Sequence, residues 1–362
     1  LGGRRPAAAA VGELIPVSAT CFREGHDSLG VEVVLTRPDG TVATVERMHP
    51  TGTGLDGWAA AIRPDSVGLW HFTIRSWGDA WGTWEHRADI KVPAGLDVDL
   101  ELDEGALLLD SHALTLADKT QTKALQRAAS TMRNLALTHA ERLAAAHEPV
   151  IEAIIAANPM REYPTDSGPW PLQVQRRRAL YGSWYEFFPR SEGASTDPLR
   201  SGTFNEAAKR LPAIAEMGFD VVYVPPIHPI GRINRKGPNN TLTPGPQDPG
   251  SPWAIGSTDG GHDAVHPDLG TLADFDAFVK AMNNLGMEIA LDLALQAAPD
   301  HPWVAAHPEW FTTRADGTIA YAENPPKKYQ DIYPLNFDND PEGLYAEVER
   351  VVRFWVERGV RI

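Results

Sequence analysis

From residue 180 onward the sequence repeats one unit three times: a stretch of helical spacing, a glycine, and a short apolar run. Each helix is expected to begin at a capping residue and to end at a glycine, the pairs being Thr203 and Gly218, Thr271 and Gly286, and Asp340 and Gly359. The apolar runs 219–224 and 287–295 predict strands that are buried on both faces, as in a parallel sheet with crossover helices.

A doubly wound sheet and a barrel both show this pattern, and the loops distinguish them. Long loops rich in Pro, Gly, Asn, Lys and Trp follow both runs, at the strand ends where barrel enzymes build their sites. We therefore predict a (β/α)8 TIM barrel that starts at residue 179. A full barrel takes about 250 residues. The chain opens on Leu1, and Ile362 lies inside an apolar run, so residues 179–362 are expected to be only the first part, truncated at the fourth strand, of a longer protein.

The first half of the chain has two other patterns. Residues 1–97 contain short β-branched runs separated by turns, which predicts a β-sandwich. Residues 98–178 change to Ala, Leu, Arg and Glu, which predicts an α-helical insert or bundle, helical from about 103 to 162. Five tryptophans fall in the first region: Trp58, Trp70, Trp77, Trp81 and Trp84. They suit either a platform on which sugars stack or a buried core, and the usual burial of Trp favours the core.

Composition excludes several classes of function. Lys and Arg number 33 against 48 Asp and Glu in 362 residues, a net charge of −15, which argues against binding to nucleic acid or to an anionic membrane surface. The single cysteine, Cys21, excludes an internal disulfide framework. No run approaches the ~18 apolar residues of a membrane span, so a cytoplasmic protein is expected. We expect no cofactor and no metal, because the spacing of Asp300, His301 and His307 fits capping or turn roles better than a metal site.

Two loops combine lysines with amides, aromatics and an acid. One covers residues 225–240 and includes Lys236; the other covers residues 323–331. Amides and carboxylates suit sugar hydroxyls, and a lysine suits a phosphate. The alternative is a pair of solvated basic loops. Asp292 is expected inside an apolar strand, where an unpaired charge is costly, so it needs a partner or a polar site.

Several segments of the chain resemble the α-amylase clan, glycoside hydrolase family 13. The segments 223–229, 261–271 and 292–296 are similar to the ordered signature segments of that clan. Segments 234–237, 253–256 and 324–331 resemble one group within it, the α-1,4-glucan:maltose-1-phosphate maltosyltransferases, and this resemblance covers essentially the whole chain. Ordinary amylases carry Asn-His where this chain has Gln296 and Ala297, a departure that argues against a generic amylase.

The resemblance implies a donor site and a reaction. Lys236, Gln296 and Asp331 would contact α-maltose 1-phosphate, with further contacts to the same pocket from Asn324, Lys327, Tyr329 and Ser251. It implies transfer of maltosyl units to the non-reducing end of α-1,4-glucans by retaining double displacement, releasing phosphate, in a cytoplasmic homodimer. The nucleophilic Asp and the acid–base Glu would lie beyond Ile362, so no catalytic residue is expected within the chain and the fragment alone is expected to be inactive. The alternatives are an α-glucan hydrolase of the same clan and a non-catalytic glucan-binding protein that uses the tryptophan-rich region.

Overall fold

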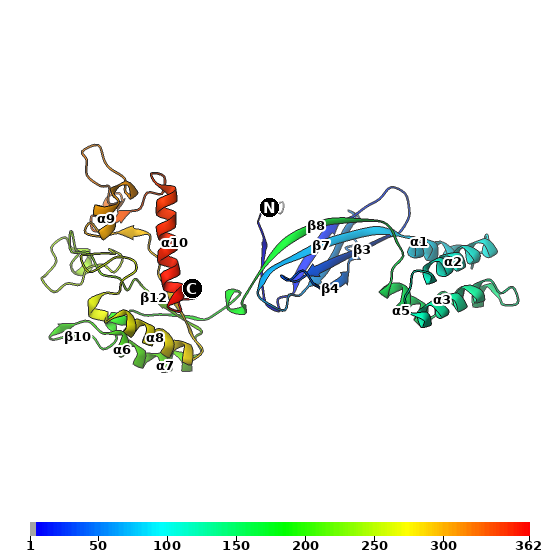
Figure 1. The fold of residues 1–362 in the computed structure, drawn as a ribbon, viewed down its shortest axis with the longest axis horizontal. Coiled ribbons are helices and arrows are strands. Elements are labelled where there is room, and N and C mark those ends of the chain that lie inside the picture. Colours follow the sequence, from blue (N-terminus) through cyan, green and yellow to red (C-terminus); the bar gives the residue numbers. More distant parts are fainter. Residues whose placement is uncertain (1–4) are drawn as a thin grey trace. The chain divides into compact units, whose positions relative to one another are not determined.

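The structure is a computed structural model that describes residues 5–362. The chain forms two compact units, the first ending at Tyr181 and the second spanning Gly182–Ile362 (Figure 1). Because each unit has its own hydrophobic core, each can be described by itself. No helix in the described part of the chain has the length and apolar character that a membrane crossing requires.

Two β-sheets share a core in the first unit. The larger sheet has the strand order β1 (Ala7–Ala10), β8 (Arg161–Gln175), β7 (Gly68–Asp79), β3 (Leu29–Thr36) and β4 (Val42–Arg47). The smaller sheet has the order β2 (Ile15–Thr20), β6 (Gly57–Ile62) and β5 (His49–Pro50). The inward side chains of both sheets form one apolar cluster, which includes Val17, Val33, Ile62 and Trp70. The predicted strands of this region are therefore present.

A block of helices connects β7 to β8 and has a second apolar core (Figure 1). Its helices are α1 (Ala80–Lys91), α2 (Val98–Ala113), α3 (Lys119–Met132), α4 (His139–Ala144) and α5 (Pro149–Ala157). The predicted bounds were wrong at both ends. Helix α1 begins directly at the end of β7, because the carboxylate of Asp79 accepts a hydrogen bond from the Gly82 amide and caps it. Residues 161–175, expected in the helical region, form the long strand β8 instead.

The tryptophans of the first unit are mostly core residues. Trp70, Trp77, Trp81 and Trp84 are each at most 4% exposed, and only Trp58 is partly exposed. The guanidinium groups of Arg47 and Arg161 lie 4.6 and 4.7 Å from the centre of the Trp77 ring. The two arginines cover the Trp77 ring, and burial alone leaves no sugar-stacking platform on the other three rings, which confirms the core interpretation for these four tryptophans.

The second unit contains a parallel sheet whose strands follow chain order. The sheet consists of β9 (Trp184–Glu186), β12 (Val221–Val224) and β13 (Glu288–Leu291). The amide of Leu291 donates a hydrogen bond of 3.0 Å to the carbonyl of Ile362, so the end of the chain lies next to β13. This curled sheet corresponds to part of a barrel wall. Strand β13 ends at Leu291, so the prediction that Asp292 lies inside a strand was wrong: it opens the following loop.

Helices α6 (Phe204–Ala207), α7 (Leu211–Glu216), α8 (Leu272–Asn284) and α10 (Pro341–Glu357) accompany the sheet, as predicted (Figure 1). Thr203 and Thr271 form capping boxes with Glu206 and Asp274, and Asp340 caps α10. The terminating glycines Gly218, Gly286 and Gly359 have φ of 86°, 76° and 92°, a left-handed conformation that other residues adopt only with strain.

The shorter elements belong to the loops. The strands are β10 (Ser195–Thr196), β11 (Leu199–Arg200), β14 (Gln296–Ala297), β15 (Ala322–Asn324), β16 (Lys327–Tyr329) and β17 (Tyr333–Pro334). A short helix, α9, spans Pro302–Ala306, and single 3₁₀ turns are η1 (Arg177–Ala179), η2 (Pro189–Ser191), η3 (Ala208–Arg210), η4 (Pro238–Asn240), η5 (Pro267–Leu269) and η6 (Pro308–Trp310).

Candidate ligand site after strands β12 and β13

The two lysine-bearing loops begin at the same edge of the sheet. Strands β12 and β13 are parallel neighbours, paired from Val221 opposite Glu288 to Val224 opposite Leu291. Their carboxyl ends therefore coincide, and the loops that follow, 225–270 and 292–339, start side by side. In a barrel this edge is the one that carries the functional site.

Lys236 joins the two loops. Its side chain is only 5% exposed, and its Nζ donates a hydrogen bond of 2.7 Å to Oε1 of Gln330. The amide Nδ2 of Asn234 donates to the carbonyl of Gln330 at 3.1 Å, so two residues of one loop hold one residue of the other. A lysine ammonium has three donors, and within the described residues Lys236 uses one of them.

Asp331 is a second buried charge next to this contact. It is 3% exposed, and its Oδ1 has no hydrogen-bond partner in the described part of the chain. Burial raises the pKa of this carboxyl, and the charge of nearby Lys236 opposes the rise. A buried acceptor without a partner is costly, which makes Asp331 a candidate to accept a ligand hydroxyl.

Asp292 has the partners that the sequence requires. Its Oδ2 accepts hydrogen bonds from the hydroxyl of Tyr223 at 2.8 Å and from the indole Nε1 of Trp253 at 2.9 Å. Burial and the hydrogen bond to Asp292 raise the pKa of Tyr223 to about 12, so the phenol stays protonated and donates. Gln296 contacts the same loop, because its Nε2 donates to the carbonyl of Trp253 at 2.9 Å.

The ladder between β14 and β17 links Gln296 to the lysine-bearing segment. Gln296 pairs with Pro334, which follows Asp331 closely in the chain. Ser251 lies at the start of the Trp253 turn, where its Oγ accepts from the Trp253 amide at 3.4 Å. The structure thus connects Lys236, Gln296, Asp331 and Ser251 through Gln330, Trp253 and the β14–β17 ladder.

The remaining predicted site residues lie in the hairpin β15–β16. Asn324 and Lys327 are backbone partners at its tip, and both are exposed, whereas Tyr329 is half-buried at its base. No side-chain contact of Asn324 or Lys327 with Lys236 is recorded among the described residues. The hairpin leads directly into Gln330 and Asp331, so its base is fixed to the site while its tip extends into solvent.

A buried chain of histidines supports these loops and was not predicted. The Trp303 amide donates to Nδ1 of His301 at 3.0 Å, which leaves the hydrogen of His301 on Nε2. That nitrogen lies 3.1 Å from Nδ1 of His262, whose own Nε2 lies 2.9 Å from the carbonyl of Ala294. Each ring then donates once and accepts once as a neutral imidazole. Burial and the neighbouring imidazoles lower the pKa of His301 to about 2, consistent with this.

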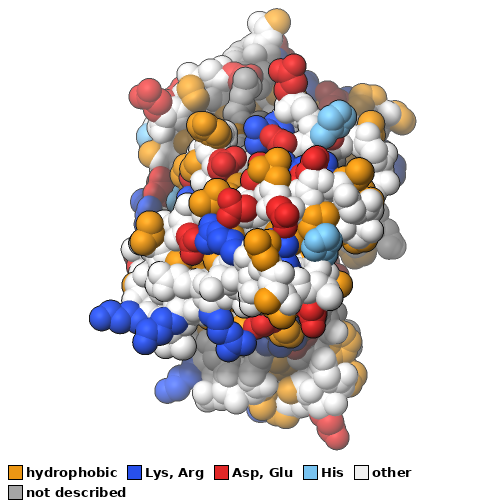
Figure 2. All heavy atoms as spheres, turned by 90° about the vertical axis from the view of Figure 1, so that its right-hand side faces the viewer, with side chains coloured by type: hydrophobic (Ala, Val, Ile, Leu, Met, Phe, Trp, Pro, Cys, Tyr) orange, Lys and Arg blue, Asp and Glu red, His pale blue; other side chains and the backbone are white. Residues whose placement is uncertain are grey.

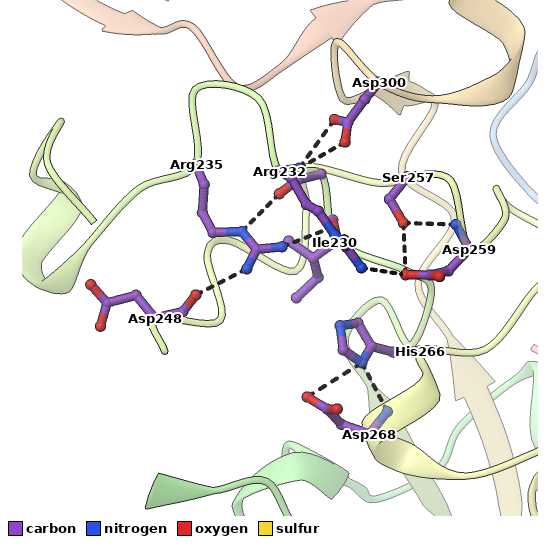
Figure 3. A network of polar contacts seen from close by, with 10 residues as sticks. Ile230, Arg232, Arg235, Asp248, Ser257, Asp259, His266, Asp268 and Asp300 are labelled. Carbon is purple, nitrogen blue, oxygen red and sulfur yellow. Dashed lines mark hydrogen bonds and ion pairs between the residues drawn. The ribbon is translucent and has the colours of Figure 1, made fainter. Parts of the chain in front are cut away.

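The rejected metal site is a set of structural contacts. His301 caps α9, and the carboxylate of Asp300 accepts from the Arg232 amide at 2.9 and 3.1 Å (Figure 3). His307 stacks on Trp310 with ring centres 3.9 Å apart. No group of three or more potential metal ligands occurs among residues 5–362.

Tyr223, Trp253 and Gln330 are the site residues that sequence reasoning did not select. All three lie inside the segments that carry the family resemblance, but their roles depend on contacts over long sequence separations, such as Lys236 to Gln330. The sequence indicated only that Asp292 needs a partner. It did not indicate that Tyr223 and Trp253 are those partners.

The sequence is closely similar to known enzymes. The family model described as "Alpha-1,4-glucan:maltose-1-phosphate maltosyltransferase, domain N/S" matches residues 1–176. Alpha-1,4-glucan:maltose-1-phosphate maltosyltransferase 1 of Streptomyces coelicolor is 56% identical over 360 residues, covering 99% of this chain and 53% of the relative. The maltosyltransferases of Arcanobacterium haemolyticum and Mycolicibacterium smegmatis are 52% and 48% identical, covering 100% and 99% of this chain and 53% and 56% of theirs.

The chain spans about half the length of the curated relatives it matches. Among solved structures, an α-amylase from Lactobacillus plantarum is similar at a TM-score of 0.40 and 28% identity, covering 49% of this chain and 36% of that chain. A TM-score of 0.40 carries no argument about this chain, so the comparison with known families depends on the sequence similarity.

Proposed function

Because the chain belongs to the α-1,4-glucan:maltose-1-phosphate maltosyltransferase family, we propose that it supplies the donor-binding part of an enzyme that transfers maltosyl units. The donor is α-maltose 1-phosphate, the acceptor is the non-reducing end of an α-1,4-glucan, and phosphate is released. The observation that carries this proposal is the buried contact between Lys236 and Gln330 beside the unpartnered Oδ1 of Asp331.

The chemistry of that contact fits a phosphorylated sugar. Lys236 has two ammonium donors left for phosphate oxygens, and its burial strengthens an ionic hydrogen bond. Asp331 is an acceptor for a sugar hydroxyl, and the Gln296 amide oxygen is a second one, since its nitrogen is held by Trp253. Asn324, Lys327, Tyr329 and Ser251 complete the pocket in this proposal, the first two by movement of the β15–β16 hairpin.

The proposed reaction is a retaining double displacement. A carboxylate attacks the anomeric carbon while a second carboxyl group protonates the departing phosphate; the glucan 4-hydroxyl then displaces the enzyme as that second group removes its proton. We assign neither carboxylate to this chain and place both in the part of the family's length that it does not span. The 362-residue chain is therefore expected to bind the donor without transferring from it.

A hydrolase of the α-amylase clan is the alternative reaction. The resemblance disfavours it, because Gln296 and Ala297 replace the Asn-His of ordinary amylases, and Ala297 is a fully buried residue of the β14–β17 ladder. A glucan-binding protein that uses the first unit is disfavoured by the burial of four of its tryptophans.

A cytoplasmic homodimer is part of the same proposal. The helical block of the first unit exposes several large apolar side chains, namely Ile90, Leu96, Leu100, Leu107 and Leu114. Figure 2 looks onto the end of Figure 1 that carries these helices and shows hydrophobic side chains lying between charged ones. Analytical ultracentrifugation of the chain tests the proposed dimer. A monomer at all concentrations would contradict an interface on this block.

Two measurements test the reaction. A protein of the full family length is incubated with α-maltose 1-phosphate and a short maltooligosaccharide. The phosphate released is measured, and the lengths of the oligosaccharide products are determined by mass spectrometry. Transfer gives phosphate together with products lengthened by whole maltosyl units. Release of reducing sugar from the oligosaccharide alone indicates the hydrolase instead. The 362-residue chain is titrated with α-maltose 1-phosphate by calorimetry, and absence of saturable binding would contradict the donor site.

A further inference from the structure

A cavity in the second unit has no role in the proposed reaction. Its volume is about 690 Å³, and it lies between η2, the β10–β11 hairpin and the loops 230–249 and 259–268. Arg235 lines it, whereas Lys236, the next residue, contacts Gln330 instead. Adjacent side chains of one loop therefore face two different places.

Arg190 brings a positive charge without a partner to this cavity. Among the described residues its guanidinium makes no hydrogen bond and no ion pair, although the side chain is partly buried. Burial lowers the pKa of Arg190, and the like charge of Arg235 lowers it further. A guanidinium carries five donors, so those of Arg190 are available to a ligand in the cavity.

Arg235 adds a second charge that no carboxylate neutralises. Its guanidinium donates only to backbone carbonyls, at 3.0 Å to Gly231, 3.1 Å to Asp248 and 3.3 Å to Ile230 (Figure 3). Figure 3 shows the carboxylate of Asp248 pointing away from Arg235. That carboxylate instead accepts a hydrogen bond from the Gly245 amide. The backbone contacts hold Arg235 in place and leave its charge intact.

The other charges of the cavity largely cancel. Arg232 pairs with Asp259 at 3.0 Å, and Arg200 pairs with Glu206 at 2.8 Å. The carboxylate of Asp268 lies 3.7 Å from Nδ1 of His266, and its charge also acts on Arg190. Burial and the charge of Arg190 lower the pKa of His266 to about 4, so this ring is neutral at neutral pH. Within the described residues, the lining arginines that no carboxylate pairs with are therefore Arg190 and Arg235, and the lining acids that no arginine pairs with are Asp248, whose carboxylate contacts the Gly245 amide, and Asp268.

We propose that this cavity binds a phosphate dianion, held by Arg190 and Arg235. Guanidinium groups bind phosphate oxygens through paired hydrogen bonds. The other two arginines of the cavity, Arg200 and Arg232, are paired with carboxylates, whereas Arg190 and Arg235 are not paired with any in the described part of the chain. The lining includes serine and threonine hydroxyls but no Phe, Tyr or Trp. A nucleobase or a glucan therefore has no ring to stack on, which leaves inorganic phosphate or the phosphate group of a small sugar.

The test separates this cavity from the candidate donor site. In a Lys236→Met background, calorimetric titration with inorganic phosphate and with α-glucose 1-phosphate is expected to show saturable binding. Adding Arg190→Gln is expected to weaken that binding at least about tenfold, the effect of losing a charged hydrogen bond. Tighter binding of α-glucose 1-phosphate would identify a sugar phosphate as the ligand, and tighter binding of inorganic phosphate would identify the free ion; both support the site.

The controls address folding and charge. Arg190→Gln removes no internal hydrogen bond, so the thermal midpoint without phosphate is expected to stay unchanged. Arg190→Lys keeps the charge without the paired donors, and it is expected to weaken binding less than Arg190→Gln. The exposed Arg353 lies on α10, which does not line the cavity, so Arg353→Gln is expected to bind phosphate as tightly as its parent protein. Equal phosphate affinity in the Arg190→Gln, Arg190→Lys and parent proteins, or loss of all binding in Lys236→Met alone, would overturn the proposal.

Discussion

Replacing Lys236 by Met is the sharpest test of the candidate donor site. Methionine keeps an unbranched chain of similar length in a position that is only 5% exposed, so the loop should retain its packing while the charge is lost. The change removes one hydrogen bond to Gln330 and two donors available to a phosphate. A hydrogen bond to a charged group contributes about 1.5–3 kcal/mol. The dissociation constant for α-maltose 1-phosphate is therefore expected to rise by roughly 10- to 150-fold.

The assay compares α-maltose 1-phosphate with maltose, which lacks the phosphate. Titration calorimetry of the variant should show the loss for α-maltose 1-phosphate and little change for maltose, because only the phosphate interacts with the ammonium. Lys209→Met removes an exposed lysine of the same unit and should leave both affinities unchanged. If α-maltose 1-phosphate bound equally well to the Lys236→Met variant, or if both ligands lost affinity equally, Lys236 would not contact the phosphate.

Three further predictions concern the groups around the site. Burial raises the pKa of Asp331, so the folded state loses stability as pH rises through that pKa; Asp331→Asn should raise the thermal midpoint at neutral pH, not in acid, and should weaken α-maltose 1-phosphate binding. Tyr223→Phe removes one of two donors to Asp292 and should lower the free energy of unfolding by about 1.5–3 kcal/mol in urea denaturation, and an unchanged midpoint would show that the bond is not formed. Burial lowers the pKa of His301 to about 2, so the folded state holds this ring neutral. The stability that the neutral ring contributes is fully present above the usual histidine pKa of about 6.5 and is lost as pH falls, because the unfolded chain then takes up the proton more readily. The thermal midpoint should then drop on acidification, and the drop should be smaller in His301→Gln.

The elements of the second unit could be predicted because their signals are local. Capping at Thr203 and Thr271 and the left-handed glycines Gly218 and Gly286 depend on residues within one turn, and the structure has them where the sequence indicates. The strand 287–295 was predicted too long, because its apolar pattern continues past Leu291 although the hydrogen bonding stops there.

The long-range features could not be predicted. Strand β8 is rich in charged and polar residues and pairs with β7 across the entire helical block, so no pattern near residues 161–175 indicates it. The contact of Lys236 with Gln330 was not predicted, because the family resemblance placed residues of both loops at one donor site without indicating which side chains of the protein meet. Trp81 and Trp84 were assigned to the β-region 1–97, whereas capping by Asp79 starts a helix there.

The helical block leaves the larger sheet at Asp79 and returns to it at Arg161, and these two residues sit opposite each other in the ladder between β7 and β8. In topological terms the whole block replaces the turn of a hairpin. The block has its own apolar core, and its two ends are adjacent, as in a domain inserted into a host fold. Insertion and replacement of a segment are tolerated where its two ends lie close together. Evolution could lengthen, shorten or swap this piece while the remaining strands keep their register, and a protein engineer could do the same.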